Sequence, residues 1–374
     1  MSTTSVTTSE LDLASFSRIF SDVTNSYKYL FFLSVLTLMR NKGLPRTETN
    51  FSLRDLAIEM AVLAWYPKCY FHLDFGPTDQ LEKILKNISY DLIQSTLTDK
   101  LHRKLRKEIS ERSEELDLKK LLLRYVPYAL LVPFYRSDLK ERPIDNNQYE
   151  TQLRELVTGA TTKTSPLYTI SEDGLSITIN TVWSTYLSDN FKMIEGWSRH
   201  QWAIFLQKRN PNVPGILSKL SPPEVRGSLT KQSKFWNEIL RSAPIKCIYS
   251  GESLRAKNFD LDHFIPWSFV GHDELWNLIP VTGEANRSKG NQLPNALYFD
   301  RFIDIQSHGL HESCRQMSEN LWKRSVEGYV SVLKLDYSEL KDKNSLRGAY
   351  RKLIFPMLET ARLTGFGHGW KFSK

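Results

Sequence analysis

The residue types best suited to chemistry lie close together in residues 258–294, NFDLDHFIPWSFVGHDELWNLIPVTGEANRSKGNQLP. The tetrapeptide Asp260-Leu261-Asp262-His263 places two carboxylates and an imidazole within one short stretch. Alternation along a strand puts Asp260 and Asp262 on one face, and His263 comes where that strand ends. A carboxylate beside a histidine can hold a metal ion while the imidazole stays neutral and basic. On its own such a pair is weak evidence for a metal site next to a base, because many Asp-His pairs are purely structural.

Fourteen positions after His263, a lone asparagine, Asn277, stands between the apolar residues Trp276 and Leu278. These neighbours predict that Asn277 is buried. A buried amide must be hydrogen-bonded, so we expect its side chain to tie two backbone segments together.

A short basic stretch follows, whose residues 284–289 have helix-compatible spacing and end at Gly290. The side-chain carbonyl of Asn286 can supply an oxygen ligand opposite Asp262 for a hard cation. Arg287 and Lys289 add positive charge where a phosphate would lie. Strand, loop and helix thus combine the groups needed for metal-assisted phosphodiester cleavage. For Arg287, as for Asp260, a structural or surface role remains an open alternative.

Taken in order, His263, Asn277 and Asn286 resemble the signature of the HNH endonuclease superfamily and its ββα-metal finger. The third position is asparagine instead of the second histidine of the family name, which is a common variant. The resemblance implies that His263 is the general base and that Asp262 and Asn286 ligate Mg²⁺ or Mn²⁺. Asp260 would be an additional ligand, or it would contact a metal ligand without touching the ion itself.

The same resemblance implies roles for the remaining residues of the segment. Lys289 or Arg287 would stabilise negative charge in the transition state, and Asn277 would hold the loop that carries His263. The products would be a 5′-phosphate and a 3′-hydroxyl. One such site cuts one strand, so a monomer would nick DNA, and a double-strand break would need a dimer or successive nicks.

The stretch CIYSG, residues 247–251, resembles the strand and turn that open this finger. Many relatives carry Cys-x-x-Cys here and a matching pair later, and the two pairs bind structural zinc. This chain has Ser250 in the second place and no later pair, so we predict no structural zinc. Its three cysteines are widely scattered, which fits the reducing cytosol and predicts a cytoplasmic protein.

The elements around this segment predict a mainly α (α+β) fold with four parts. Residues 1–15 are rich in Ser and Thr and are expected to be flexible, and residues 16–238 form a helical sensing or docking domain. Within that domain, PLYTISEDGLSITI (166–179) predicts a small hairpin. Residues 239–300 form the finger, and residues 301–374 form a basic helical region. The apolar run 29–39 is too short to span a bilayer, so we expect a buried helix and no membrane insertion.

A positive charge balance favours a polyanionic partner. The formal net charge is +8, and residues 340–374 hold eight basic and two acidic side chains with several aromatic ones between them. This composition suits a phosphate backbone, with a plain amphipathic helix as the competing interpretation. Composition alone does not decide between the two, and it is the resemblance to HNH endonucleases that implies DNA as the substrate.

Several further segments, among them AWYPKCYFHLDFGPTDQL and KRNPNVPGI, resemble a bacterial group in which a long helical region precedes one HNH finger. Such proteins are often associated with anti-phage defence or restriction. The resemblance implies a nuclease effector whose helical part senses DNA or docks a partner defence protein. Two alternatives stay open: a DNA-binding or adaptor protein that uses the finger as a scaffold, and an RNA-cutting toxin.

Overall fold

A computed structural model describes residues 11–76, 79–81, 85, 99–114, 117–135, 149–159, 165–221 and 228–373. The expected flexible stretch 1–15 lies largely outside these residues. Within it, the side chain of Asp12 accepts a hydrogen bond from the Ser15 backbone N–H and caps helix α1, Leu13–Phe16.

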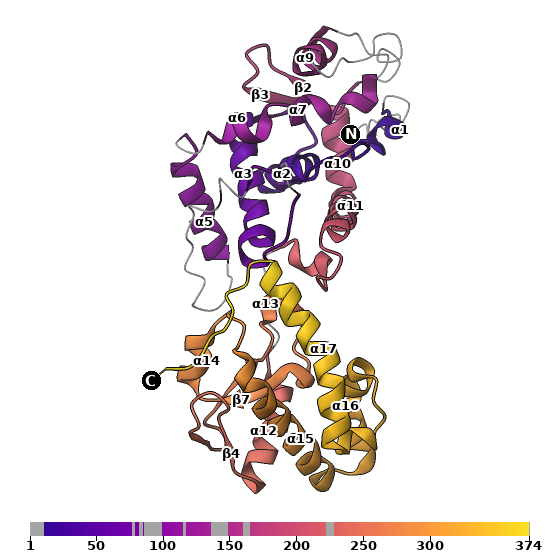
Figure 1. The fold of residues 1–374 in the computed structure, drawn as a ribbon. Coiled ribbons are helices and arrows are strands. Elements are labelled where there is room, and N and C mark those ends of the chain that lie inside the picture. The colour runs from indigo at the N-terminus through magenta and orange to yellow at the C-terminus, as the bar shows by residue number, and fades with distance from the viewer. Residues whose placement is uncertain are drawn as a thin grey trace. The chain divides into compact units, whose positions relative to one another are not determined.

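In the part of the chain that the structure describes, helices dominate and three small sheets accompany them, which confirms the predicted mainly α (α+β) fold (Figure 1). The chain divides into two compact units. The first comprises Met1–Tyr90, Leu97–Asn210 and Lys219–Pro222, and the second comprises Asp91–Thr96, Pro211–Ser218 and Pro223–Lys374. Among the helices of the described residues, none has the combined length and apolar character of a membrane span.

The core of the first unit is built on helix α2, which contains the apolar run seen in the sequence. Eleven consecutive residues of α2, from Tyr29 to Met39, are buried, as predicted. Helix α3 packs along it and is capped by Ser52, whose hydroxyl accepts a hydrogen bond from the Asp55 backbone N–H. The described helices of this unit are α1, α2 (Tyr27–Asn41), α3 (Leu53–Trp65), η2 (Tyr66–Tyr70), α5 (Asp99–Glu111), α6 (Leu118–Leu123), α7 (Val126–Ala129), η3 (Val132–Tyr135), α9 (Tyr149–Gly159), α10 (Thr181–Asp189) and α11 (Phe191–Arg209). The short helix η5 (Ile216–Lys219) lies in the second unit except for its last residue.

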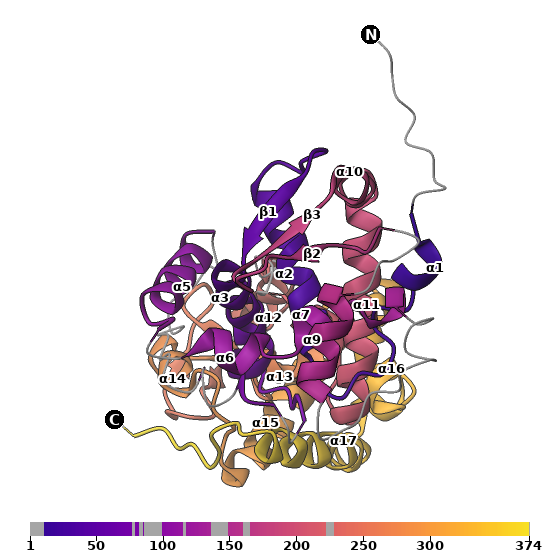
Figure 2. The ribbon, with the colours of Figure 1, turned by 90° about the horizontal axis from the view of Figure 1, so that it is seen from above.

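The predicted hairpin is present as strands β2 (Thr169–Ile170) and β3 (Ser176–Ile179), which pair antiparallel. A third strand, β1 (Thr49–Ser52), pairs with the other edge of β3 and gives the order β1-β3-β2 (Figure 2). Sequence inspection missed β1 because four residues between two long helices carry too little periodicity to be recognised.

The second unit contains the finger and the helices that follow it. Two antiparallel strand pairs, β4 with β5 and β6 with β7, precede the short helix α14. The elements are α12 (Thr230–Ser242), β4 (Ile245–Lys246), β5 (Ser253–Leu254), β6 (Asp260–His263), α13 (Trp267–Val270), η6 (Leu275–Asn277), β7 (Leu278–Val281), α14 (Gly283–Lys289), η7 (Ala296–Tyr298), α15 (Phe299–Gln316), α16 (Glu319–Leu333), η8 (Glu339–Lys341) and α17 (Lys343–Leu363).

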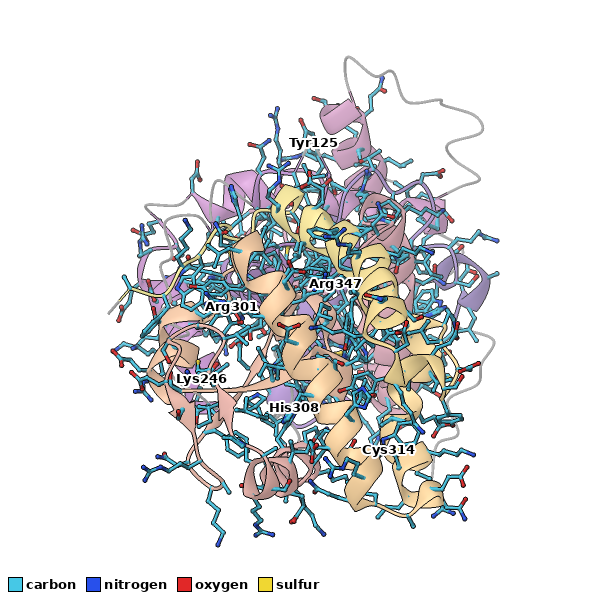
Figure 3. All side chains as sticks on the ribbon, turned by 60° about the horizontal axis from the view of Figure 1, so that its bottom comes forward. Tyr125, Lys246, Arg301, His308, Cys314 and Arg347 are labelled. Carbon is cyan, nitrogen blue, oxygen red and sulfur yellow. The ribbon has the colours of Figure 1, made fainter. Side chains whose placement is uncertain are left out.

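Aromatic packing joins the finger to the helices of the second unit. Phe264, which follows β6, stacks on Phe302 of α15 with ring centroids 4.2 Å apart. Gly309 of α15 lies against Trp236 of α12 so closely that a Cβ atom there would come within 2.7 Å of the indole. Helices α15 and α17 run side by side, and Figure 3 labels Arg301 on the first and Arg347 on the second.

Candidate active site

The pairing of β6 with β7 sets the positions of the acid and the imidazole that the sequence singles out. Asp262 is the partner of Ile279 in the register, and His263 is the partner of Leu278. All four residues of β7 are buried, so the strand that carries Asp262 and His263 is paired with a fully buried, largely apolar strand. Both polar side chains are themselves buried. The cost of burying them must therefore be offset by hydrogen bonds.

Both carboxylate oxygens of Asp262 accept a hydrogen bond. The Tyr249 hydroxyl donates to Oδ2 over 2.7 Å, and the Lys289 ammonium lies 2.9 Å from Oδ1. Lys289 Nζ also donates to the backbone carbonyl of His263 over 2.7 Å. Burial raises the pKa of Tyr249 well above its ordinary value, and the charge of Asp262 adds to the shift. The phenol therefore stays protonated and acts as a donor.

Lys289 is a buried cation and does not face solvent. Its side chain is 0% exposed, at the end of α14, and its ammonium is directed at Asp262 and at the carbonyl of His263. A buried carboxylate needs a paired cation to remain charged at low cost. Lys289 provides that cation and also fastens the end of α14 to β6.

His263 has a partner that the sequence reasoning did not identify. Its Nε2 lies 2.9 Å from Oδ1 of Asp273, in the loop between α13 and η6. The loop is held in place by Gln232 of α12, whose Nε2 donates to the Asp273 carbonyl over 2.9 Å. When Nε2 carries the proton and donates it to Asp273, the lone pair is on Nδ1. In the sequence, Asp273 is visible as an acidic residue directly after Gly271-His272. Its separation from His263 matches neither a helix nor a strand period, so the sequence does not pair the two residues.

Asn277 is completely buried and its amide makes two hydrogen bonds to one residue. Its Oδ1 accepts from the Ile265 backbone N–H over 2.9 Å, and its Nδ2 donates to the Ile265 carbonyl over 2.8 Å. Its own carbonyl accepts from the Phe264 N–H over 2.9 Å. The residue thus fixes the backbone immediately after His263.

The remaining candidates lie where α14 begins, beside the first residue of β6. Asn286 Nδ2 donates to Asp260 Oδ2 over 3.3 Å. A Cβ atom on Gly283 would lie 3.2 Å from the same carboxylate oxygen and 3.1 Å from the Arg287 guanidinium. Arg287 itself is exposed. The structure therefore groups Asp260, Asn286 and Arg287 and leaves the guanidinium facing solvent.

Three helices that follow the finger support its loop through buried polar groups. Gln306 of α15 donates to the carbonyls of Leu275 and Leu278 over 3.3 and 3.1 Å, and its Oε1 accepts from the Tyr329 hydroxyl over 2.6 Å. The Tyr350 hydroxyl donates to the Trp276 carbonyl over 2.8 Å. Residues of α15 and α17 thus satisfy carbonyl groups around η6 that lie away from water, and Tyr329 of α16 orients Gln306.

The basic segment 340–374 is partly neutralised by neighbouring acids. Lys343 lies 2.7 Å from Asp304, and Arg347 lies 3.4 Å from Asp300. Sequence inspection missed these pairs because both acids are on α15, which is about forty residues upstream. Arg351 and Lys352 of α17 are exposed and could contact the phosphates of a polyanion.

The candidate donor atoms are oxygens, which hard divalent cations prefer as ligands. Mg²⁺, for example, is usually bound through one or two carboxylates and substrate phosphates, and it keeps several water ligands. Each Asp262 oxygen accepts one hydrogen bond and has a further lone pair, and the Asn286 Nδ2 bond to Asp260 leaves the Asn286 carbonyl oxygen as a donor atom. A cage of three His, Cys, Asp or Glu side chains is absent from the described part of the chain. An ion here would share Asp262 with Lys289.

Where many relatives of the finger carry a zinc-binding pair, this chain has a small polar cluster. The Ser250 backbone N–H lies 3.5 Å from Cys247 Sγ, and Thr282 Oγ1 lies 3.9 Å from the same sulfur. Thr282 also donates to the Ser250 hydroxyl over 3.4 Å. Hydrogen bonds thus join the finger's opening turn to the start of α14. The absence of structural zinc stays a prediction.

Comparison with known proteins identifies this part of the chain. Residues 247–295 match the model of a family described as HNH endonuclease. This range includes the catalytic and metal-ligand candidates predicted from the sequence, which are Asp260, Asp262, His263, Asn277, Asn286, Arg287 and Lys289. No solved structure matches the chain.

Proposed function

Because residues 247–295 are an HNH endonuclease domain, we propose that the protein is a metal-dependent endonuclease that hydrolyses phosphodiester bonds in DNA. The observation that carries this proposal is the arrangement at the end of β6. There Asp262 is buried between Tyr249 and Lys289, and the adjacent His263 is oriented by Asp273. A positioned base beside an oxygen-ligand site is what metal-assisted hydrolysis requires.

His263 is the general base in this proposal. Asp273 accepts the hydrogen bond from Nε2, which fixes the tautomer and leaves Nδ1 to take a proton from the attacking water. Asn277 holds the turn that follows His263, so the imidazole keeps one orientation. A base of this kind typically contributes ~10²–10⁴-fold to the rate.

Asp262 and Asn286 are the proposed ligands of Mg²⁺ or Mn²⁺, with Asp260 as an additional or outer carboxylate. Such an ion would supply Lewis-acid polarisation of the scissile phosphate. Lys289 pairs with Asp262 and holds its carboxylate in place. The exposed Arg287 is placed to contact substrate phosphate, and Arg351 and Lys352 add positive charge on α17.

The finer proposals rest on the sequence and its resemblances. With one finger per chain, a monomer nicks one strand. We place the protein in the cytoplasm, as the nuclease effector of a bacterial anti-phage defence system. In this proposal the helical residues 16–238 sense DNA or dock a partner protein.

The test compares substrate classes under one salt condition, since backbone affinity depends steeply on ionic strength. Purified protein is incubated with supercoiled plasmid, linear DNA and structured RNA, each with Mg²⁺, with Mn²⁺ and with EDTA. We expect metal-dependent cutting of DNA that leaves 5′-phosphate ends. Cutting of RNA alone would indicate a toxin nuclease, and binding without cutting would indicate an adaptor with a scaffold finger. Either result contradicts the proposal.

A further inference from the structure

The segment Phe366–Phe372, which follows α17, returns to the finger and pairs with the residues after α14. The Leu293 N–H donates to the Gly367 carbonyl over 2.7 Å, and the Trp370 N–H donates to the Leu293 carbonyl over 3.1 Å. The Asn295 N–H donates to the Trp370 carbonyl over 2.9 Å. In Figure 1 this end of the chain passes beside α14. The segment is thus attached to the finger by a short backbone ladder.

The ladder brings the Trp370 side chain against Tyr249. The two rings meet edge to face, with centroids 4.9 Å apart and planes at 86°. Tyr298 also packs edge to face against Tyr249, with centroids 4.9 Å apart. Gly369, with φ of +75°, supplies the left-handed turn that precedes the indole. Trp370 and Tyr249 are both buried, so the phenol ring is enclosed on these sides.

The enclosed phenol ends at the candidate metal ligand. Its hydroxyl donates to Asp262 Oδ2, while Lys289 holds Oδ1. Two donors on different oxygens fix both the position and the plane of a carboxylate. Packing alone does not require the hydroxyl, because a phenylalanine ring would fill the same space. The hydroxyl therefore matters for Asp262 and not for the core.

We propose that Tyr249 is a positioning residue for Asp262 and that the Phe366–Phe372 segment, through Trp370, holds Tyr249 in place. The inference rests on the proposed function, in which Asp262 is a metal ligand. Under this proposal, Trp370 influences metal affinity although it lies outside residues 247–295. Loss of a group that orients a ligand typically weakens metal binding ~10–100-fold.

The test measures Mn²⁺ affinity of the full chain by calorimetry, without nucleic acid, and the Mg²⁺ concentration for half-maximal plasmid nicking. Tyr249→Phe removes the hydroxyl and keeps the ring, and we expect a ~10–100-fold weaker Mn²⁺ affinity. Trp370→Ala shifts the affinity in the same direction, and Trp370→Phe restores most of it. Lys371→Ala, in the same segment with an exposed side chain, is the matched control and leaves affinity unchanged. The maximal nicking rate at saturating Mg²⁺ falls less than the affinity.

Two outcomes separate this inference from the proposed function. If the wild type binds Mn²⁺ and nicks DNA while Tyr249→Phe and Trp370→Ala keep its affinity, the inference is overturned and the function stands. If the wild type neither binds metal nor cuts, the function fails, and amide hydrogen exchange of residues 260–263 decides the positioning claim. Trp370→Ala must then speed exchange there while Lys371→Ala does not. Equal exchange in both variants overturns the claim.

Discussion

His263 Nε2 lies 2.9 Å from Asp273 Oδ1, although the two residues come from different elements. His263 is the last residue of β6. Asp273 lies in a loop, and its backbone carbonyl accepts a hydrogen bond from Gln232 of α12. The imidazole thus has one nitrogen committed to a carboxylate. Its other nitrogen is the one that can accept a proton from water.

Replacing Asp273 by Asn is expected to slow cleavage while leaving the fold intact. The amide cannot hold the tautomer as the carboxylate does, so the maximal rate should fall ~10–100-fold, a part of the total contribution of a general base. The measurement is the single-turnover rate of plasmid nicking at saturating Mg²⁺. Glu274→Gln changes the adjacent, exposed carboxylate and should keep the wild-type rate. A wild-type rate for Asp273→Asn would remove Asp273 from the mechanism.

Replacing Asn277 by Ala is expected to destabilise the second unit. The change leaves the N–H and the C=O of Ile265 buried without their partners, and each such group costs ~1–3 kcal/mol. We therefore expect a loss of about 2–6 kcal/mol, seen as a lower melting temperature in calorimetry. Asn291→Ala, at an exposed position after α14, is the control and should melt like the wild type. Equal melting temperatures for the two variants would show that the double hydrogen bond contributes nothing.

The sequence was informative where chemistry and local pattern coincide. Asp262, His263 and Asn286 lie within about 25 residues, and local patterns around them predict a strand at 260–263 and a short helix at 284–289. The buried helix α2 and the hairpin of β2 and β3 were also predictable, because long apolar runs and turn residues are local signals.

Contacts made across long sequence separations were not predictable in this way. Trp370 reaches Tyr249 from 121 residues away, and Gln306 reaches the carbonyl of Leu275 from another helix. No periodicity encodes such pairs, because they depend on how the helices pack. The burial of Lys289 was missed for a related reason, since a lysine in a basic stretch resembles a surface residue until its partner is known.

Lys289→Met is expected to make the stability of the second unit depend on metal. The variant leaves Asp262 buried without its cation, and breaking such a pair costs ~3–5 kcal/mol. A divalent ion at Asp262 would recover part of that loss, so Mn²⁺ should raise the melting temperature more in the variant than in the wild type. Lys257→Met, at an exposed position, serves as the control. An equal rise in all three proteins would mean that no ion binds next to Lys289.

Glu59 in α3 should give the first unit a specific pH dependence. Burial raises the pKa of its carboxyl, and Arg106, 3.5 Å away, opposes the shift. Within the described structure, both carboxylate oxygens lack a hydrogen-bond donor. Because the folded state holds this proton more tightly than the unfolded state, stability falls as pH rises from the ordinary glutamate range through the raised pKa.

Glu59→Gln removes that titration. We expect its melting temperature to fall less than that of the wild type when the pH is raised from 4 to 8, as followed by calorimetry. Glu48→Gln replaces an exposed carboxylate in the same unit and should follow the wild-type curve. If Glu59→Gln follows it too, the buried carboxyl does not control the pH dependence.

The central claim is that His263 is the base of a metal-dependent endonuclease. The most direct measurement is the conversion of supercoiled plasmid to relaxed circles by the wild type, by His263→Ala and by His311→Ala, which changes an exposed histidine on α15. With Mg²⁺, the account predicts nicking by the wild type and by His311→Ala, and a ~10²–10⁴-fold slower rate for His263→Ala. Equal rates for His263→Ala and the wild type, or an intact plasmid in every reaction, would contradict it.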